Sequence, residues 1–200
     1  MSARPIIEPA FADRVRDSQW IFRRAIEAMA SPGRVVTLRS KLAPPAPLNG
    51  PAAALLLTLC DFETPVWLDA PLAENAGVCS FLRFHTGAGL VASPVAAAFA
   101  AIADPVAMPH LSEFSQGTLA YPDRSTTLIV QVGALSADGW RLEGRGVRSS
   151  VRFSAAPLPI DFVGRLRANG AAFPCGVDIL FAADDAIAAL PRSVRLKEPA

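Results

Sequence analysis

The seven residues RFHTGAG, at positions 83–89, bring together an arginine, a histidine and two glycines that could handle an anion or a proton. Alternation over residues 79–86 predicts a strand, in which the first and third residues of the motif share one face about 7 Å apart at Cα. The loop after this strand could offer backbone N–H groups to a phosphate. A plain strand-to-loop turn remains the simpler interpretation, ahead of a phosphate contact and then a proton donor. The candidate anion ligands in the motif are Arg83, His85, Thr86 and Gly87.

Two further arginines stand beside expected strand ends, where phosphate-binding guanidinium groups are often placed. Arg124 belongs to the stretch DRST and Arg145 to the stretch GRG. A planar guanidinium can hold a phosphate through two parallel hydrogen bonds, but surface ion pairing is the more common role and is favoured for both arginines. Asp178 raises a separate question, because a carboxylate inside an otherwise apolar strand needs a partner. We expect a structural salt bridge from Asp178 to Arg192.

Several motifs that would allow catalysis by this chain alone do not occur in the sequence. Neither of the two glycine-rich nucleotide-binding patterns is present, and neither are G-x-S-x-G and H-E-x-x-H. The chain has two histidines, which does not support a multi-histidine metal centre. Lys41 lies beside a proline-rich loop and Lys197 near the C-terminus, so neither is expected to hold pyridoxal phosphate covalently. We therefore expect no cofactor and no metal, and the sequence identifies no catalytic residue.

The composition is that of a well-packed globular chain without a strong charge preference. Of the 200 residues, 52% are hydrophobic, and the 19 basic and 18 acidic residues leave a net charge of +1. This balance disfavours nucleic acid and anionic membranes as partners. The N-terminal segment is interrupted by charges and prolines, and the longest apolar run, residues 52–60, is too short to span a bilayer. We expect a soluble cytoplasmic protein in which Cys60, Cys79 and Cys175 act as small apolar groups.

Hydrophobic spacing predicts helices that alternate with strands along the chain. A helix over residues 18–30 is expected to be capped by Asp17 or Ser18 and to end at Ser31, before Pro32 and Gly33. Its apolar stripe consists of Ile21, Phe22, Ala25, Ile26 and Met29. Further helices are expected over residues 52–61 (with Asn49 as its cap), 110–116, 160–170 and 185–190. Strands are expected over residues 34–38, 64–69, 79–86, 125–135, 139–147, 151–154, 176–184 and 193–197. The segment 93–105 fits a helix start or a buried strand equally well.

This alternation predicts one domain over residues 1–200, with a layered α/β/α architecture around a mixed sheet. The strands expected over residues 125–135 and 139–147 should form a hairpin through an Asp138–Gly139 turn and supply the antiparallel part of that sheet. No internal repeat or low-complexity linker divides the sequence.

Six stretches, taken together, resemble the PhnH family of the bacterial carbon–phosphorus lyase system. They are FRRAIEAMASPGR, LLLTLCDFETPVWL, LRFHTGA, GTLAYPDRSTTLIVQV, FPCGVDILF and ALPRSVRL, and they cover most of the chain in order. One departure is visible at residues 144–147, where a GPGI-like segment is expected and the chain has GRGV. A role for that loop is therefore transferred less safely than the rest.

The resemblance implies an accessory subunit of the lyase core complex, which forms homodimers and assembles with the G, I and J subunits. This complex participates in making ribose 1-methylphosphonate 5-triphosphate from an alkylphosphonate and ATP, and its catalytic residues lie mainly on the other subunits. The implied fold is similar to the large domain of pyridoxal-phosphate-dependent transferases, without the cofactor. Two alternatives stay open: an independent phosphate- or phosphonate-ester-binding domain or small enzyme using RFHTGAG, and a structural subunit whose sole activity is dimerisation.

Overall fold

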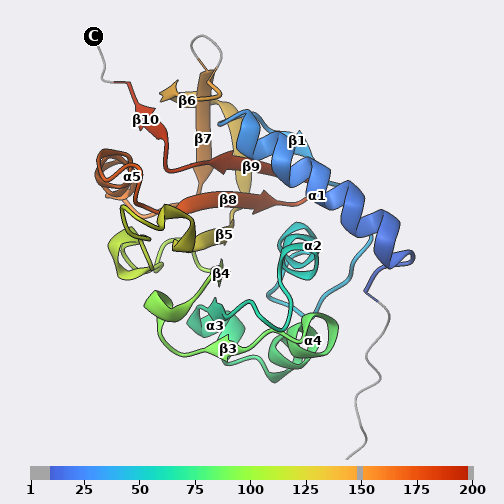
Figure 1. Cartoon of the computed structure of the whole chain (residues 1–200). Helices are drawn as coiled ribbons and strands as arrows, with labels where there is room; N and C mark the ends of the chain where they lie inside the picture. The colour runs from blue at the N-terminus through green and yellow to red at the C-terminus, as the bar shows by residue number, and fades with distance from the viewer. Residues whose placement is uncertain (1–9, 148–150, 198–200) are drawn as a thin grey trace, which may run out of the picture.

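A computed structural model describes residues 10–147 and 151–197 of the chain (Figure 1). Helices and strands alternate along most of this length. The helices are α1 (Arg14–Ala30), α2 (Gly50–Leu59), α3 (Ala70–Ala73), α4 (Ala76–Thr86) and α5 (Phe162–Ala171), with the 3₁₀ turns η1 (Pro94–Ala96), η2 (Leu111–Glu113) and η3 (Pro122–Arg124). The strands are β1 (Val36–Thr37), β2 (Val66–Leu68), β3 (Leu90–Val91), β4 (Phe99–Ile102), β5 (Thr127–Gln131), β6 (Ala134–Gly144), β7 (Val151–Ala156), β8 (Asp178–Ala183), β9 (Ala186–Leu190) and β10 (Val194–Leu196).

A seven-stranded mixed sheet with the order β1-β9-β8-β5-β4-β2-β3 forms the centre of the described structure. The strands from β8 to β3 run parallel, and β9 and β1 are antiparallel to their neighbours. Successive residues of β5 enter opposite cores, with Leu128 on one side and Ile129 on the other. Because both sides of the strand are buried, β5 is a continuous apolar run, as is typical of parallel strands. The expected mixed α/β class with a mixed sheet is confirmed.

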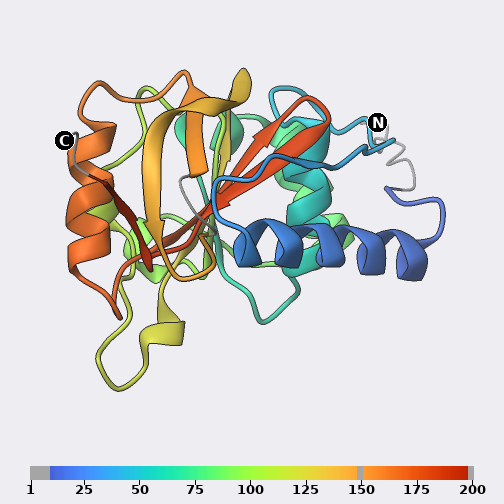
Figure 2. The ribbon, with the colours of Figure 1, turned by 90° about the horizontal axis from the view of Figure 1, so that it is seen from above.

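Helices α1, α2 and α4 cover one face of the sheet and form the first core with it (Figures 1 and 2). Asn49 caps α2 as expected, with its side chain accepting a hydrogen bond from Ala52 N. The cap of α1 is Asp13 instead of Asp17 or Ser18, so this helix begins earlier than predicted. The buried residues of α1 are Ile21, Ala25 and Ala28. Phe22 and Ile26 are about half exposed, so the predicted five-residue stripe is wrong in two members.

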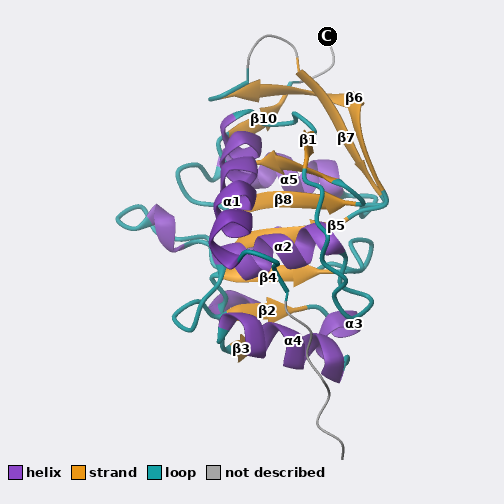
Figure 3. Cartoon of the chain, turned by 90° about the vertical axis from the view of Figure 1, so that its right-hand side faces the viewer, coloured by secondary structure: helices purple, strands orange, loops and turns teal. Residues whose placement is uncertain are grey.

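The opposite face of the sheet is covered by α5 together with a separate three-stranded sheet, β10-β6-β7 (Figures 2 and 3). This arrangement corrects the predicted hairpin, because Asp138 and Gly139 lie inside β6, where a bulge interrupts its pairing with β7. Residues 139–144 of the expected strand 139–147 are therefore the second half of β6, and the end of the expected strand 125–135 supplies its first two residues, Ala134 and Leu135. The antiparallel part of the central sheet comes from β9 and β1 instead.

Residues 79–86 form most of helix α4, so the predicted strand at this position is wrong. Asn75 caps the helix at its start, and Gly87 ends it in the left-handed conformation with φ of 73°. The buried residues Val78, Phe81 and Leu82 have helical spacing. The alternation of apolar and polar residues over these eight positions fitted a strand as well as a helix. The caps at both ends, Asn75 and Gly87, favour the helix.

Residues 186–190 form strand β9, which corrects the predicted helix over 185–190. Asp184 and Asp185 make a two-residue turn, after which Ala186 pairs with Ala183 of β8. Ile187 packs in one core and Ala188 in the other. Small residues buried on both faces leave no amphipathic pattern, so the periodicity could not reveal the strand.

The segment 93–105, which fitted two structures, contains η1 followed by β4, and residues 110–116 contain the short turn η2. None of the helices in the described ranges has the length and apolar character needed to cross a membrane.

Candidate functional site

The RFHTGAG residues lie at the C-terminal end of α4, where local hydrogen bonds already use their polar groups. Gly87 N donates to Arg83 O at 3.0 Å, which closes the last turn of the helix. Thr86 Oγ1 donates to Leu82 O at 2.7 Å and accepts from Ala88 N at 3.0 Å. The end of a helix at which its carbonyl groups point outward carries partial negative charge, which repels an anion. The geometry therefore favours the structural interpretation of this motif over a phosphate cradle.

Arg83 and His85 do not share a face, because residues two apart on a helix point about 200° away from each other. The ring of His85 packs edge-on against Phe81 and Phe84, with centroid distances of 4.7 and 5.0 Å. Its carbonyl oxygen accepts a hydrogen bond of 3.5 Å from Arg14 of α1. His85 thus joins the end of α4 to the start of α1.

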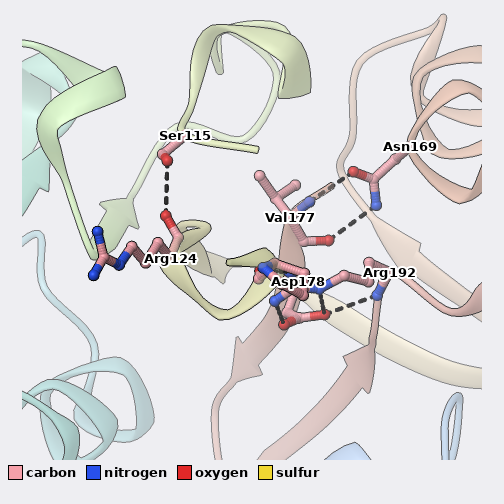
Figure 4. A network of polar contacts seen from close by, with 7 residues as sticks. Ser115, Arg124, Asn169, Val177, Asp178 and Arg192 are labelled. Atoms are coloured by element: carbon pink, nitrogen blue, oxygen red, sulfur yellow. Dashed lines mark hydrogen bonds and ion pairs between the residues drawn. The ribbon is translucent and has the colours of Figure 1, made fainter. Parts of the chain in front are cut away.

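The other two candidates, Arg124 and Arg145, lie away from α4. Arg124 ends η3, where its guanidinium carbon lies 4.4 Å from the ring centre of Tyr121 and its carbonyl accepts from Ser115 Oγ at 2.8 Å (Figure 4). Arg145 follows β6 and lines a hollow that Pro122 and Asp123 of η3 also border. Of the predicted anion ligands, Arg145 therefore lines this hollow, whereas Arg124 and the α4 residues do not.

This hollow has a volume of about 530 Å³ and adjoins the amino end of β8. Its wall combines apolar side chains with charged ones. The lining residues include Met29, Pro122, Asp123, Arg145, Phe173, Asp178 and Arg192. A hollow with apolar walls and convergent polar groups is a reasonable candidate for ligand binding.

The predicted ion pair between Asp178 and Arg192 is confirmed (Figure 4), and both residues line the hollow. Arg192 donates from its backbone N and its Nε to Asp178 Oδ1, at 2.8 and 3.2 Å, and from Nη2 to Oδ2 at 2.5 Å. Its Nη1 donates to the carbonyl oxygen of Pro122. The two side chains are 13–15% exposed, and most donors of the guanidinium are already bound within the protein. The pair therefore fixes β8, the end of β9 and η3 to one another.

Asn169 of α5 supports the same region, although the sequence predicts only that it lies at the end of a helix. Its Oδ1 accepts from Val177 N at 2.8 Å and its Nδ2 donates to Val177 O at 2.9 Å (Figure 4). The side chain is buried, and a Cβ at Gly176 would lie 2.8 Å from Asn169 Oδ1. In the sequence, Asn169 and Gly170 look like an ordinary helix end. The structure shows that the Asn169 side chain also holds the chain where it enters β8.

At the carboxyl ends of the parallel strands, where open α/β sheets usually bind their ligands, the chain fills the space with its own polar groups. Gln131, at the end of β5, accepts from Asn49 N at 2.5 Å and donates to Pro47 O at 2.9 Å. Asn49 Nδ2 donates to Ala182 O of β8 at 3.2 Å. The loop before α2 therefore occupies the position where a cofactor would be expected in such a fold.

Asp69, directly after β2, closes the same edge next to these groups. Its Oδ2 accepts from the backbone N of Ala103 and of Asp104, at 2.7 and 2.8 Å, and its Oδ1 accepts from Leu72 N at 3.4 Å. Burial raises the pKa of Asp69 above its ordinary value, while the backbone donors act in the opposite direction. These hydrogen bonds give Asp69 the role of a structural acceptor that joins the ends of β2 and β4.

Burial raises the pKa of the Cys60 thiol to about 12, and the nearby Asp61 carboxylate adds to the effect. Cys60 is therefore the small apolar group that the sequence predicts. Cys79 and Cys175 are free and partly buried.

Comparison with known proteins identifies relatives across almost the whole chain. Residues 9–197 match the family described as "Bacterial phosphonate metabolism protein (PhnH)". A relative from Rhizobium meliloti (strain 1021), named alpha-D-ribose 1-methylphosphonate 5-triphosphate synthase subunit PhnH, is 40% identical over 194 residues, which cover 96% of each chain. A match of this length leaves no part of the described fold outside the family, and the chain belongs to the PhnH family.

Proposed function

We propose that this chain is an accessory subunit of a synthase that forms ribose 1-methylphosphonate 5-triphosphate during the breakdown of organic phosphonates. The observation that carries the proposal is the 40% identity to a subunit of that synthase over 96% of both chains. The proposal includes homodimer formation, assembly with the G, I and J subunits, and a cytoplasmic location. The near-neutral net charge of +1 is compatible with protein partners and disfavours nucleic acid.

An accessory role also agrees with the chemistry of the described residues. The carboxyl edge of the parallel strands is filled by Asn49, Gln131 and Asp69. These contacts are backbone–side-chain bonds that stabilise the fold, and they leave little room there for a substrate. We infer from them that the catalytic groups of the synthase belong mainly to its other subunits.

We further propose that the central sheet is a cofactor-free relative of the large domain of pyridoxal-phosphate-dependent transferases. A mixed sheet covered on both faces supports this relationship. Lys41, which lies in the exposed stretch before α2, is poorly placed for a Schiff base in a closed pocket.

Growth on methylphosphonate as the phosphorus source tests the proposal. A bacterium that lacks its own PhnH gene but retains the rest of the system should grow when it receives this chain. The Arg83→Ala, His85→Ala double variant should restore growth equally well if it still folds and assembles, because both residues act at a helix end. Failure of the wild-type chain to restore growth or to co-purify with the other subunits would contradict the proposal.

Calorimetry of the isolated chain separates this role from that of an independent phosphonate-binding domain. We expect no binding heat with methylphosphonate and ATP when the other subunits are absent. Tight binding by the isolated chain that His85→Ala abolishes would favour the independent domain instead.

A further inference from the structure

Three cations stand side by side across the outer face of the small sheet, on neighbouring strands. Arg141 of β6 is the register partner of Arg152 of β7. On the other side of β6, Leu196 pairs with Leu142, and Lys197 N donates to Arg141 O at 2.8 Å. The row therefore runs Lys197, Arg141, Arg152, at one position along the three strands. We call these three residues the basic row.

Alternation along the strands directs the whole basic row to solvent. The neighbours in sequence, Leu142, Phe153 and Leu196, are buried in the second core. The three cations are exposed, and the sheet that carries them lies at the outside of the molecule (Figures 1 and 3). Nothing among the described elements covers this face.

The same face continues into further positive charge with little acidic compensation. Arg195 of β10 and Arg145 after β6 are exposed and border a common hollow with Glu143. Glu143 is the register partner of Arg195. Within the ranges 10–147 and 151–197, no ion pair joins a carboxylate to any of the basic-row residues. The face is thus strongly basic in a chain whose net charge is +1.

Like charges placed directly opposite each other on adjacent strands destabilise a sheet. Three in one row are unfavourable for the isolated chain, so a binding partner that neutralises them offers a physical reason for the arrangement. Surface patterns that cost stability are expected where function requires them.

The shape and chemistry of the face indicate which partner fits. Adjacent guanidinium groups on an open pleated surface can each bind a carboxylate through two hydrogen bonds. The basic row lies on the open surface of the sheet and not in the hollow that Glu143 borders, which suits carboxylates spread over a protein surface better than one small enclosed polyanion. We infer that the basic row docks a carboxylate-rich surface of another protein subunit of the synthase. This inference rests on the proposed function and adds to it the docking face and the charge of the partner.

The test measures association of the full chain with the co-expressed remaining subunits of the synthase, for wild type and for the Arg141→Glu, Arg152→Glu variant. Because the variant replaces attraction by repulsion, we expect at least tenfold weaker association at low salt, with a smaller dependence on salt concentration. The matched control is Arg16→Glu, Arg23→Glu, which makes the same change of four charge units at two exposed residues of α1. The control should associate as the wild type does.

A second variant, Arg141→Gln with Arg152→Gln, separates docking from folding. Removing the like-charge pair should leave the thermal midpoint of the isolated chain unchanged or higher, while association with the other subunits still weakens.

If both double variants associate with the other subunits as tightly as the wild type does, the inference is overturned and the proposed function stands. If the wild type associates with no subunit, the proposed function fails and the inference fails with it. Tight binding of inorganic tripolyphosphate by the isolated wild type, lost in Arg141→Glu, Arg152→Glu, would assign the row to a phosphate ligand and overturn the docking assignment.

Discussion

Asp178 and Arg192 show how far single residues could be understood from the sequence. A carboxylate between apolar neighbours required a partner, and the expected cation, Arg192, is the one that pairs with it. The additional bond from Arg192 to Pro122 O connects residues 70 positions apart, which no local pattern reveals. The candidate anion ligands depended on an assumed strand, so the change to a helix separated Arg83 from His85.

We predict that Asp178→Ala destabilises the protein by about 3–5 kcal/mol, because Arg192 would remain largely buried without its counter-charge. The measurement is the free energy of unfolding in urea. Asp161→Ala serves as the control, since its carboxylate is 55% exposed and pairs with Arg165 at 2.9 Å. The control should lose less stability, because solvent reaches the Asp161 carboxylate and Arg165 keeps its hydrogen bonds to the carbonyl oxygens of Met108 and Pro109. Equal losses in the two variants would show that Asp178 is not an effectively buried partner.

At the scale of elements, the prediction succeeded where the apolar pattern of a segment fitted one type of structure only. The helix starting near residue 18 and the apolar helix after Asn49 are present, as are the strands β5 and β8. Residues 79–86 were assigned the wrong type because their alternation of apolar and polar side chains fitted a strand as well as a helix, and residues 185–190 because small side chains buried on both faces leave no periodic pattern. The bulge at Asp138 and Gly139 is likewise a tertiary feature, since an Asp-Gly pair is also a common hairpin turn.

The turn after β6 meets the turn after α1, and a glycine makes this contact possible. Gly146 has φ of +81°, and a Cβ there would lie 2.8 Å from the carbonyl oxygen of Ala30. We predict that Gly146→Ala destabilises the protein by roughly 1–3 kcal/mol through backbone strain and this contact. Thermal unfolding checks the effect against Gly89→Ala, where a Cβ would meet nothing within 4 Å. A loss in Gly89→Ala as large as in Gly146→Ala would contradict this account.

At the scale of the whole molecule, two cores lie on opposite sides of one sheet. Adjacent residues of the same strand contribute to different cores, as Leu128 and Ile129 do in β5. Because the two cores share these strands, neither core can lose its packing without disturbing the strands that support the other. We therefore propose that the chain is one domain, as the sequence suggests.

This proposal predicts a single cooperative unfolding transition. Trp20 belongs to α1, on the side of the first core, and Trp140 packs against the second core. Fluorescence of two variants that retain Trp20 or Trp140 as their single tryptophan should give the same urea midpoint, which should also match the far-ultraviolet circular dichroism. Two separate midpoints would indicate two units that unfold independently.

The sequence by itself determined the class of the fold, the family, the buried helix after Asn49 and the pairing of Asp178 with Arg192. The family follows from the six stretches that resemble PhnH, and the other three follow from composition, from long apolar patterns and from the need of a buried charge for a partner. The tertiary structure alone decided that β9 is a strand, that β6, β7 and β10 form a second sheet, and that Lys197, Arg141 and Arg152 stand in one row. Strand pairing joins residues distant in sequence, and its register is set by burial in a common core, so local spacing carries no information about which side chains become neighbours.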